Sequence, residues 1–133
     1  VNQFEAKFQK LIRQEDFMLQ PFQENVIKKG EISLMVMGGE YTHSVLKIVK
    51  PGDFRVQDDF GGTVHDYEPT AQEIAFAEKA VSACDPQPNY ARVDIIRDNN
   101  DELALIEMEL IEPELWFRMK PEAAEVLAKS IDL

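Results

Sequence analysis

The alternation of apolar and charged residues in two neighbouring segments limits this fold more than any other feature. Residues 90–98, YARVDIIRD, and residues 102–110, ELALIEMEL, flank a short polar stretch. Because side chains along a strand point alternately to opposite faces, the pattern predicts an antiparallel hairpin with one apolar face. That face is expected to carry Ala91, Val93 and Ile95 from the first strand and Ala104, Ile106, Met108 and Leu110 from the second.

The other face of this hairpin is expected to be charged. If Arg97 faces Glu102 across the turn, Asp94 lies opposite Leu105 on the second strand. Side chains two residues apart then share a face. The charged face therefore collects Arg92, Asp94, Glu107 and Glu109.

Three of these residues, Asp94, Glu107 and Glu109, are carboxylates, which repel one another unless a positive charge lies among them. Hard oxygen ligands favour Mg²⁺, which takes one or two carboxylates and completes its shell with water and phosphate oxygens. A magnesium site is one interpretation. The other is a solvated face with salt bridges through Arg92 and Arg97, and spacing alone leaves both open.

Three other segments have apolar residues at helical spacing. Residues 2–14 and 121–132 predict amphipathic helices. Residues 70–84 predict a helix that begins at Thr70, because Glu73 three positions later completes a capping-box pattern. We expect this helix to cover the apolar face of the hairpin.

Two further segments are rich in strand-forming residues. Residues 16–22, DFMLQPF, predict a short buried strand that Pro21 ends. Residues 31–50 predict a second hairpin, since Gly38-Gly39 accepts the positive φ of a tight turn. Residues 51–69 show little periodicity, and loops of that length are usually functional or disordered.

In chain order, these elements predict an α+β fold with an antiparallel sheet and flanking helices, forming a single domain over residues 1–133. The formal net charge of −11 argues against a nucleic-acid partner, because such proteins usually present a basic surface. No apolar run is long enough to span a membrane. The single cysteine permits no internal disulfide, which fits a reducing, cytoplasmic location.

The second hairpin resembles a known motif. RVDIIRDNNDELALIEMEL is similar to the metal-binding hairpin of ATP-grasp ligases, and PGDFRVQDDFGG resembles a loop of the ribosomal-protein glutamate ligases. The resemblance covers about residues 15 to 130 and extends to glutathione synthetases, D-alanine–D-alanine ligases and O-ureidoserine cyclo-ligase-like proteins. Glu109 departs from the pattern, because the third metal ligand in the ligases is usually Asn.

This resemblance implies ATP and Mg²⁺ (or Mn²⁺) as cofactors and assigns three groups of residues. The implied metal ligands are Asp94, Glu107 and Glu109. The implied catalytic residues are Arg55, Arg92, Gly61 and Gly62. The implied nucleotide-binding residues are Gln20, Pro21, Phe22, Glu31 and Lys47. Where relatives often carry a basic residue this chain has Ser33, and Lys47 is expected to compensate.

ATP-grasp ligases phosphorylate a carboxylate, and an amine or other nucleophile attacks the acyl phosphate. The implied partners are therefore small-molecule carboxylate and amine substrates. We expect the chain to be a C-terminal fragment that needs the missing N-terminal part of the same chain for turnover, and self-association into a homo-oligomer is left open. Two alternatives are a non-catalytic interaction module with the ATP-grasp shape and an unrelated acidic binding domain.

Overall fold

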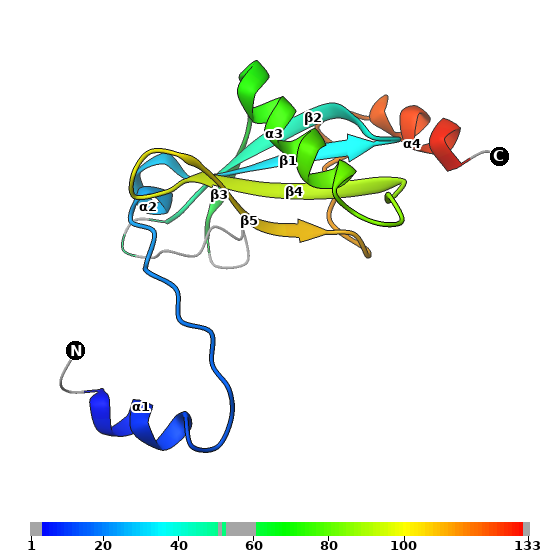
Figure 1. Cartoon of the computed structure of the whole chain (residues 1–133). Helices are drawn as coiled ribbons and strands as arrows, with labels where there is room; N and C mark the ends of the chain where they lie inside the picture. Colours follow the sequence, from blue (N-terminus) through cyan, green and yellow to red (C-terminus); the bar gives the residue numbers. More distant parts are fainter. Residues whose placement is uncertain (1–3, 51, 53–60, 132–133) are drawn as a thin grey trace.

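A five-stranded antiparallel sheet forms the centre of the computed structural model, which describes residues 4–50, 52 and 61–131. The strand order is β3-β2-β1-β4-β5 (Figure 1). This arrangement confirms the predicted α+β class with an antiparallel sheet and flanking helices. The elements in chain order are α1 (Glu5–Leu11), α2 (Asn25–Lys29), β1 (Glu31–Met37), β2 (Glu40–Ile48), β3 (Thr63–Asp66), α3 (Ala71–Ser82), β4 (Tyr90–Arg97), β5 (Leu103–Glu109) and α4 (Ala123–Ile131).

The β1–β2 hairpin lies at the middle of the sheet, and every residue of β1 is buried. Its turn is made by Gly38 and Gly39, whose φ angles of 62° and 88° are in the left-handed region that glycine tolerates. β3 forms within the segment for which the sequence predicts no regular structure, and it pairs with the second half of β2.

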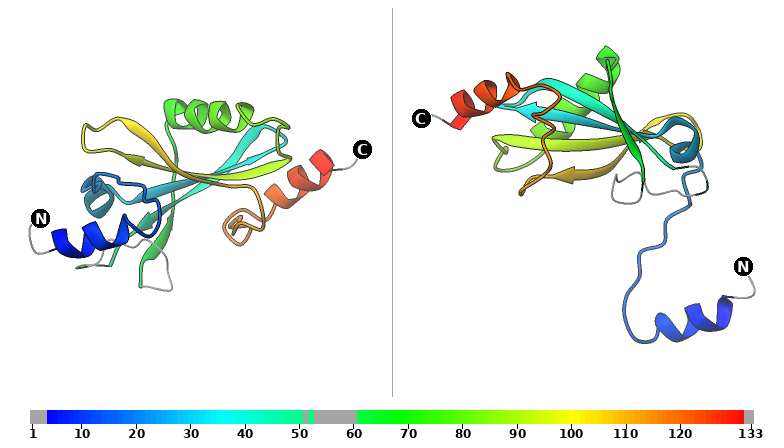
Figure 2. Two further views of the ribbon diagram at one scale, coloured as in Figure 1. Left: turned by 60° about the horizontal axis from the view of Figure 1, so that its bottom comes forward. Right: turned by 180° about the vertical axis from the view of Figure 1, so that it is seen from behind.

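Helix α3 covers one face of the sheet, as the sequence predicts (Figure 2). Ala77 and Val81 of this helix pack against an apolar layer from the central strands. The predicted capping box is present, with the Glu73 backbone N–H donating to the Thr70 hydroxyl and the Thr70 backbone N–H donating to the Glu73 carboxylate. The strand residues of this layer are Ile32, Leu34, Val36, Ala91, Val93 and Ile95.

The opposite face of the sheet is only partly covered by apolar groups. Met35, Met37 and Val45 pack against Trp116 and against Ala123 at the start of α4. This cluster lies toward the Gly38–Gly39 end of the hairpin. The rest of the face carries the charged residues that form the candidate site.

One predicted strand is wrong. Residues 16–22 form neither a strand nor a helix, and Met18 and Leu19 are 99% and 78% exposed. A strand needs a neighbouring strand for its backbone hydrogen bonds, and no described strand pairs with this segment. The segment leads from α1, which has no buried residue and stands away from the sheet (Figures 1 and 2). No helix within the described ranges is both long and apolar enough to cross a bilayer.

The predicted apolar face of β5 is also partly wrong, because the hairpin contains a β-bulge. Ile95 pairs with Leu105 whereas Asp94 pairs with Glu107, so Ile106 is an extra residue in β5. Leu103 therefore packs on the core in place of Ala104. Ile106, expected in the core, is 44% exposed.

The capping carboxylate of Glu73 supplies a prediction of pH-dependent stability. Although burial raises its pKa, the backbone N–H and hydroxyl of Thr70 together with Arg97 hold that pKa below the usual 4.5. A group with a lowered native pKa stabilises the fold above its unfolded pKa, and this benefit is lost as the pH falls through the native pKa. We expect Glu73→Gln to lower the free energy of unfolding by about 1–2 kcal/mol at neutral pH, and much less in acid.

Urea unfolding of both proteins at a series of pH values measures this difference. The control is Glu102→Gln, an exposed carboxylate in the β4–β5 turn. A deficit in Glu73→Gln that stays constant from neutral to acidic pH would contradict the assignment.

Candidate metal centre

A row of polar side chains crosses four strands on the face opposite α3. Strand register produces this row: Glu31 of β1 pairs with Lys47 of β2, and Ser33 of β1 pairs with Asp94 of β4. On the other side of β4, Asp94 pairs with Glu107 and Arg92 pairs with Glu109. Side chains directly opposite each other in antiparallel strands are close enough to interact.

The bulge in β5 corrects the predicted register of this hairpin. The sequence predicts Asp94 opposite Leu105 and diagonal to Glu107, whereas Asp94 lies directly opposite Glu107. Counting from the turn cannot detect the extra residue, Ile106. Its effect is to bring the carboxylates closer together than an uninterrupted ladder would.

Asp94, Glu107 and Glu109 each place a carboxylate oxygen within 4.8 Å of the others. Asp94 is 1% exposed, whereas the side chains of Glu107 and Glu109 are 59% and 31% exposed. The cluster is therefore buried at Asp94 and open to solvent at Glu107. Oxygen ligands on opposite sides of a bound Mg²⁺ are about 4 Å apart, so this spacing suits a shared divalent cation.

Arg92 lies among these carboxylates. Its Nε donates to Asp94 Oδ2 at 3.0 Å and its Nη2 to the same oxygen at 2.9 Å. Nη2 also forms an ion pair with Glu109 and lies 4.0 Å from Glu107. Although burial lowers the pKa of Arg92, the hydrogen bonds to Asp94 raise it overall, so the guanidinium stays charged. The sequence-based alternative of salt bridges through Arg92 therefore describes real contacts, but Arg97 instead pairs with Glu73.

A second ion pair extends the row toward β2. Lys47 pairs with Glu31, and its Nζ lies 3.5 Å from Asp94 Oδ2. All three residues are buried. Burial raises the pKa of Glu31, and the Lys47 ammonium offsets part of this effect. Buried ion pairs contribute little to stability relative to apolar packing, and shifted pKa values are common at functional sites.

Ser33 has a structural part in the site that sequence reasoning did not identify. Its hydroxyl donates to Asp94 Oδ1. The sequence could have indicated that Ser33 belongs to the site, because it lies two residues after Glu31 and therefore on the same face of β1. The sequence comparison marks Ser33 only as a replacement for a basic residue, whereas in the structure its hydroxyl holds the Asp94 carboxylate.

The structure brings together six of the twelve predicted site residues. These are Glu31, Lys47, Arg92, Asp94, Glu107 and Glu109, and their roles toward metal and nucleotide stay predictions. Arg55 lies outside the described residues. Gly61 and Gly62 directly precede β3, and Gly61 has a φ of 83°.

The predicted nucleotide-binding residues Gln20, Pro21 and Phe22 lie in an extended segment outside the sheet. The side chain of Asn99, in the β4–β5 turn, donates to the Phe22 carbonyl at 2.8 Å and accepts from the Glu24 backbone N–H at 2.8 Å. These bonds fix the end of the segment next to the hairpin that carries the carboxylates.

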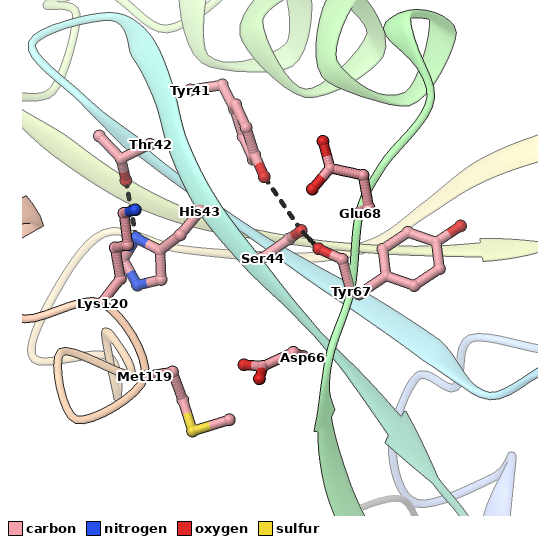
Figure 3. Close-up of a pocket in the computed structure, with 9 residues that line it drawn as sticks. All are labelled: Tyr41, Thr42, His43, Ser44, Asp66, Tyr67, Glu68, Met119 and Lys120. Carbon is pink, nitrogen blue, oxygen red and sulfur yellow. Dashed lines mark hydrogen bonds between the residues drawn. The ribbon is translucent and has the colours of Figure 1, made fainter.

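Sequence reasoning also missed a cavity of about 480 Å³ beside β2 (Figure 3). Its lining comes from β2, from the end of β3 and the two residues after it, and from the segment before α4. These segments are far apart in the sequence, and no motif links them.

The comparisons with known proteins found matches only among solved structures. No family model matches the sequence, and no curated protein sequence matches it. The structure of D-cycloserine synthetase DcsG matches with a TM-score of 0.68 and 27% identity, covering 84% of this chain and 40% of that chain. The ATP-grasp ligase PsnB, complexed with a phosphomimetic variant of its minimal precursor, Mg and ADP, matches with a TM-score of 0.53. That match has 11% identity and covers 75% of this chain and 33% of PsnB.

The buried pair of Lys47 and Glu31 supplies a test of the site's energetics. Lys47→Met leaves the carboxylates of Glu31 and Asp94 without the ammonium, which we expect to cost about 3–5 kcal/mol of unfolding free energy. The double variant Glu31→Leu/Lys47→Met should recover much of this loss, because it removes both charges.

Guanidinium chloride unfolding followed by circular dichroism measures these changes. The matched control is Lys29→Met, which removes one lysine from the exposed ion pair with Asp101 and should shift the midpoint far less. Equal shifts for Lys47→Met and Lys29→Met would contradict the buried-pair argument.

Proposed function

We propose that the chain, which is similar in structure to ATP-grasp ligases, forms the metal- and nucleotide-binding subdomain of an ATP-dependent carboxylate–amine ligase. The chain spans 40% of the length of DcsG, so the activity of a whole ligase is part of the proposal. The observation that carries it is the convergence of Asp94, Glu107 and Glu109 on one sheet face, beside Arg92.

The chemistry of this donor set suits Mg²⁺ or Mn²⁺, because all three groups offer hard oxygen ligands. Three carboxylates and the one guanidinium among them leave two negative charges, which a divalent cation balances. Asp94, Glu107 and Glu109 would hold the ion. When bound, it supplies positive charge that neutralises the nucleotide phosphates.

The residues of the chain have distinct proposed roles around the nucleotide. The Glu31 carboxylate accepts hydrogen bonds from the ribose hydroxyls, and the backbone of Gln20, Pro21 and Phe22 contacts the adenine. The Lys47 ammonium, held between Glu31 and Asp94, adds positive charge near the phosphates.

The proposed reaction has two steps. The substrate carboxylate attacks the γ-phosphorus of ATP, which forms an acyl phosphate and releases ADP. The amine then attacks the acyl carbon and inorganic phosphate leaves. Arg92 and Arg55 stabilise negative charge on the transferring phosphoryl group, while backbone N–H groups at Gly61 and Gly62 donate to an oxyanion.

One observation favours the second candidate, a non-catalytic interaction module. Arg92 already donates to Asp94 and pairs with Glu109, so the cluster is partly neutralised without a cation. In that case the carboxylates serve only to order the hairpin. Cation affinity distinguishes the two functions.

Manganese binding to this chain tests the metal assignment. We expect the chain to bind Mn²⁺, detected by its electron paramagnetic resonance signal, and Mg²⁺ to compete. Glu107→Gln should weaken binding by about tenfold or more because it removes a charged ligand from an exposed position. The control Glu102→Gln removes the same charge from the turn and should change little. Identical affinities for the two variants would remove Glu107 from the site.

Catalysis is tested on the complete ligase with ATP, Mg²⁺ and candidate amino acids. Asp94→Asn and Glu107→Gln are each expected to reduce ADP release by about 100-fold or more, since the transferring phosphoryl group loses electrostatic stabilisation. ADP release at the unaltered rate in both variants would rule out the proposed role of the carboxylates.

A further inference from the structure

The cavity beside β2 is a concave site that the proposed ligase function does not use (Figure 3). Its volume of about 480 Å³ lies within the range of about 300–1,000 Å³ that is usual for small-molecule sites. Its walls are residues 41–44 of β2, residues 66–68 and residues 119–120. We call it the β2 cavity.

The hydroxyl groups around the β2 cavity are already used as donors within the protein. The Ser44 hydroxyl donates to the Tyr67 carbonyl at 2.8 Å. Because a hydroxyl carries a single proton, the Tyr41 hydroxyl is the donor of its 3.2 Å bond to Ser44 (Figure 3). The Thr42 hydroxyl donates to the Met35 carbonyl at 3.1 Å. These three groups therefore offer lone pairs, but no proton, to a ligand.

The two nitrogen-bearing side chains of the β2 cavity also have partners in the protein. His43 Nε2 lies 2.9 Å from the Leu115 carbonyl, which can only accept a hydrogen bond. Lys120 Nζ lies 2.8 Å from a carboxylate oxygen of Glu122, so its positive charge is balanced. Neither side chain therefore neutralises the acids of the β2 cavity.

Two carboxylates of the β2 cavity, those of Asp66 and Glu68, are exposed and lack such partners. No hydrogen bond or ion pair to either carboxylate is found within the described part of the chain. Figure 3 shows both side chains on the β2 side of their segment, while the Tyr67 ring points away. Burial raises the pKa of the Tyr41 hydroxyl, and the charge of Glu68 raises it further. The β2 cavity therefore offers negative charge and hydrogen-bond acceptors.

The backbone of β2 does not offer a ladder to a peptide strand. Thr42 is the extra residue of a β-bulge and is skipped in the pairing of β2 with β1. His43 and Ser44 are each 6% exposed. The Tyr41 backbone N–H already donates to the Glu78 carboxylate at 3.0 Å. A ligand of the β2 cavity must therefore be recognised by side chains.

We propose that the β2 cavity binds a small aliphatic diamine, whose two ammonium groups pair with Asp66 and Glu68. An ammonium group donates hydrogen bonds and accepts none, which matches a lining rich in unused acceptors. The Tyr41 ring and the Met119 side chain line the β2 cavity and can contact the methylene chain. A divalent metal ion is a poorer match. Among the described residues, no third carboxylate, histidine or cysteine joins the two acids within 4.8 Å.

The β2 cavity is separate from the metal centre. Asp66 pairs with Val45, and Val45 pairs with Ser33. Ser33 in turn pairs with Asp94. Three strand spacings of about 4.8 Å place Asp66 roughly 14 Å from Asp94. Diamine binding in the β2 cavity therefore does not depend on the proposed ligase function.

Titration calorimetry and amide NMR with putrescine test the proposal. We expect saturable binding that shifts the amide signals of Tyr41, Asp66 and Glu68. The diol analogue of putrescine has the same length and no charge, and it should bind at least about fivefold more weakly. The double variant Asp66→Asn/Glu68→Gln should also weaken putrescine binding about fivefold or more. The matched control Glu15→Gln/Glu112→Gln removes two charges elsewhere and should change affinity less than about twofold.

Both acids are exposed, so the double variant should unfold at the same urea concentration as the parent chain. If it unfolds earlier, the single variant Glu68→Gln carries the test and should still weaken binding. Equal binding of putrescine and its diol analogue would overturn the diamine as the ligand. Unchanged affinity in the variants that lack the acids would overturn the location. Displacement of putrescine by an equal concentration of Mg²⁺ would reassign the two acids to a divalent cation.

Discussion

The buried carboxylate of Asp94 is the interaction on which the charged face depends. A carboxylate with 1% exposure is costly unless its oxygens are satisfied, and here the Ser33 hydroxyl and the Arg92 guanidinium both donate to it. Lys47 adds a positive charge at 3.5 Å. These partners come from three strands, so the sheet must be assembled before the charge is compensated. Apolar residues in place of this whole group of buried charges would stabilise the fold at least as well, so stability alone does not account for the acid, and the proposed metal site does.

The carboxylates of the site can be neutralised in two ways, by the guanidinium of Arg92 or by a bound cation. In the structure its guanidinium bridges Asp94 and Glu109, the two acids that are least exposed in the cluster. A divalent cation and this guanidinium would compete for the same oxygen atoms. Glu107 is the most exposed of the three proposed ligands. In the proposed site, metal affinity would therefore depend on how readily Glu109 exchanges the guanidinium of Arg92 for the metal ion.

Local signals in the sequence were sufficient for much of the fold. The capping box at Thr70 and Glu73, the Gly38-Gly39 turn and the strand alternation in 90–98 each involve only nearby residues, and the structure contains all three. The apolar run at 16–22 shows the limit of such signals, because strand formation requires a neighbour that composition does not reveal. Glu31 and Lys47 were assigned to the site from family resemblance alone. Their contact with each other across β1 and β2 was not predicted. The cavity beside β2 was missed because segments that are distant in the sequence build it.

The extra residue in β5 has a consequence for sequence comparison. The alternation of side chains between the two sheet faces shifts by one residue at Ile106. As a result, Glu107 and Glu109 lie on the face that even-numbered residues occupy between Ile106 and the turn. For a relative whose hairpin lacks this extra residue, an alignment that counts outward from the β4–β5 turn would place hydrophobic positions against Glu107 and Glu109. Homologous hairpins are better anchored on the carboxylates, with any gap assigned to the position of Ile106.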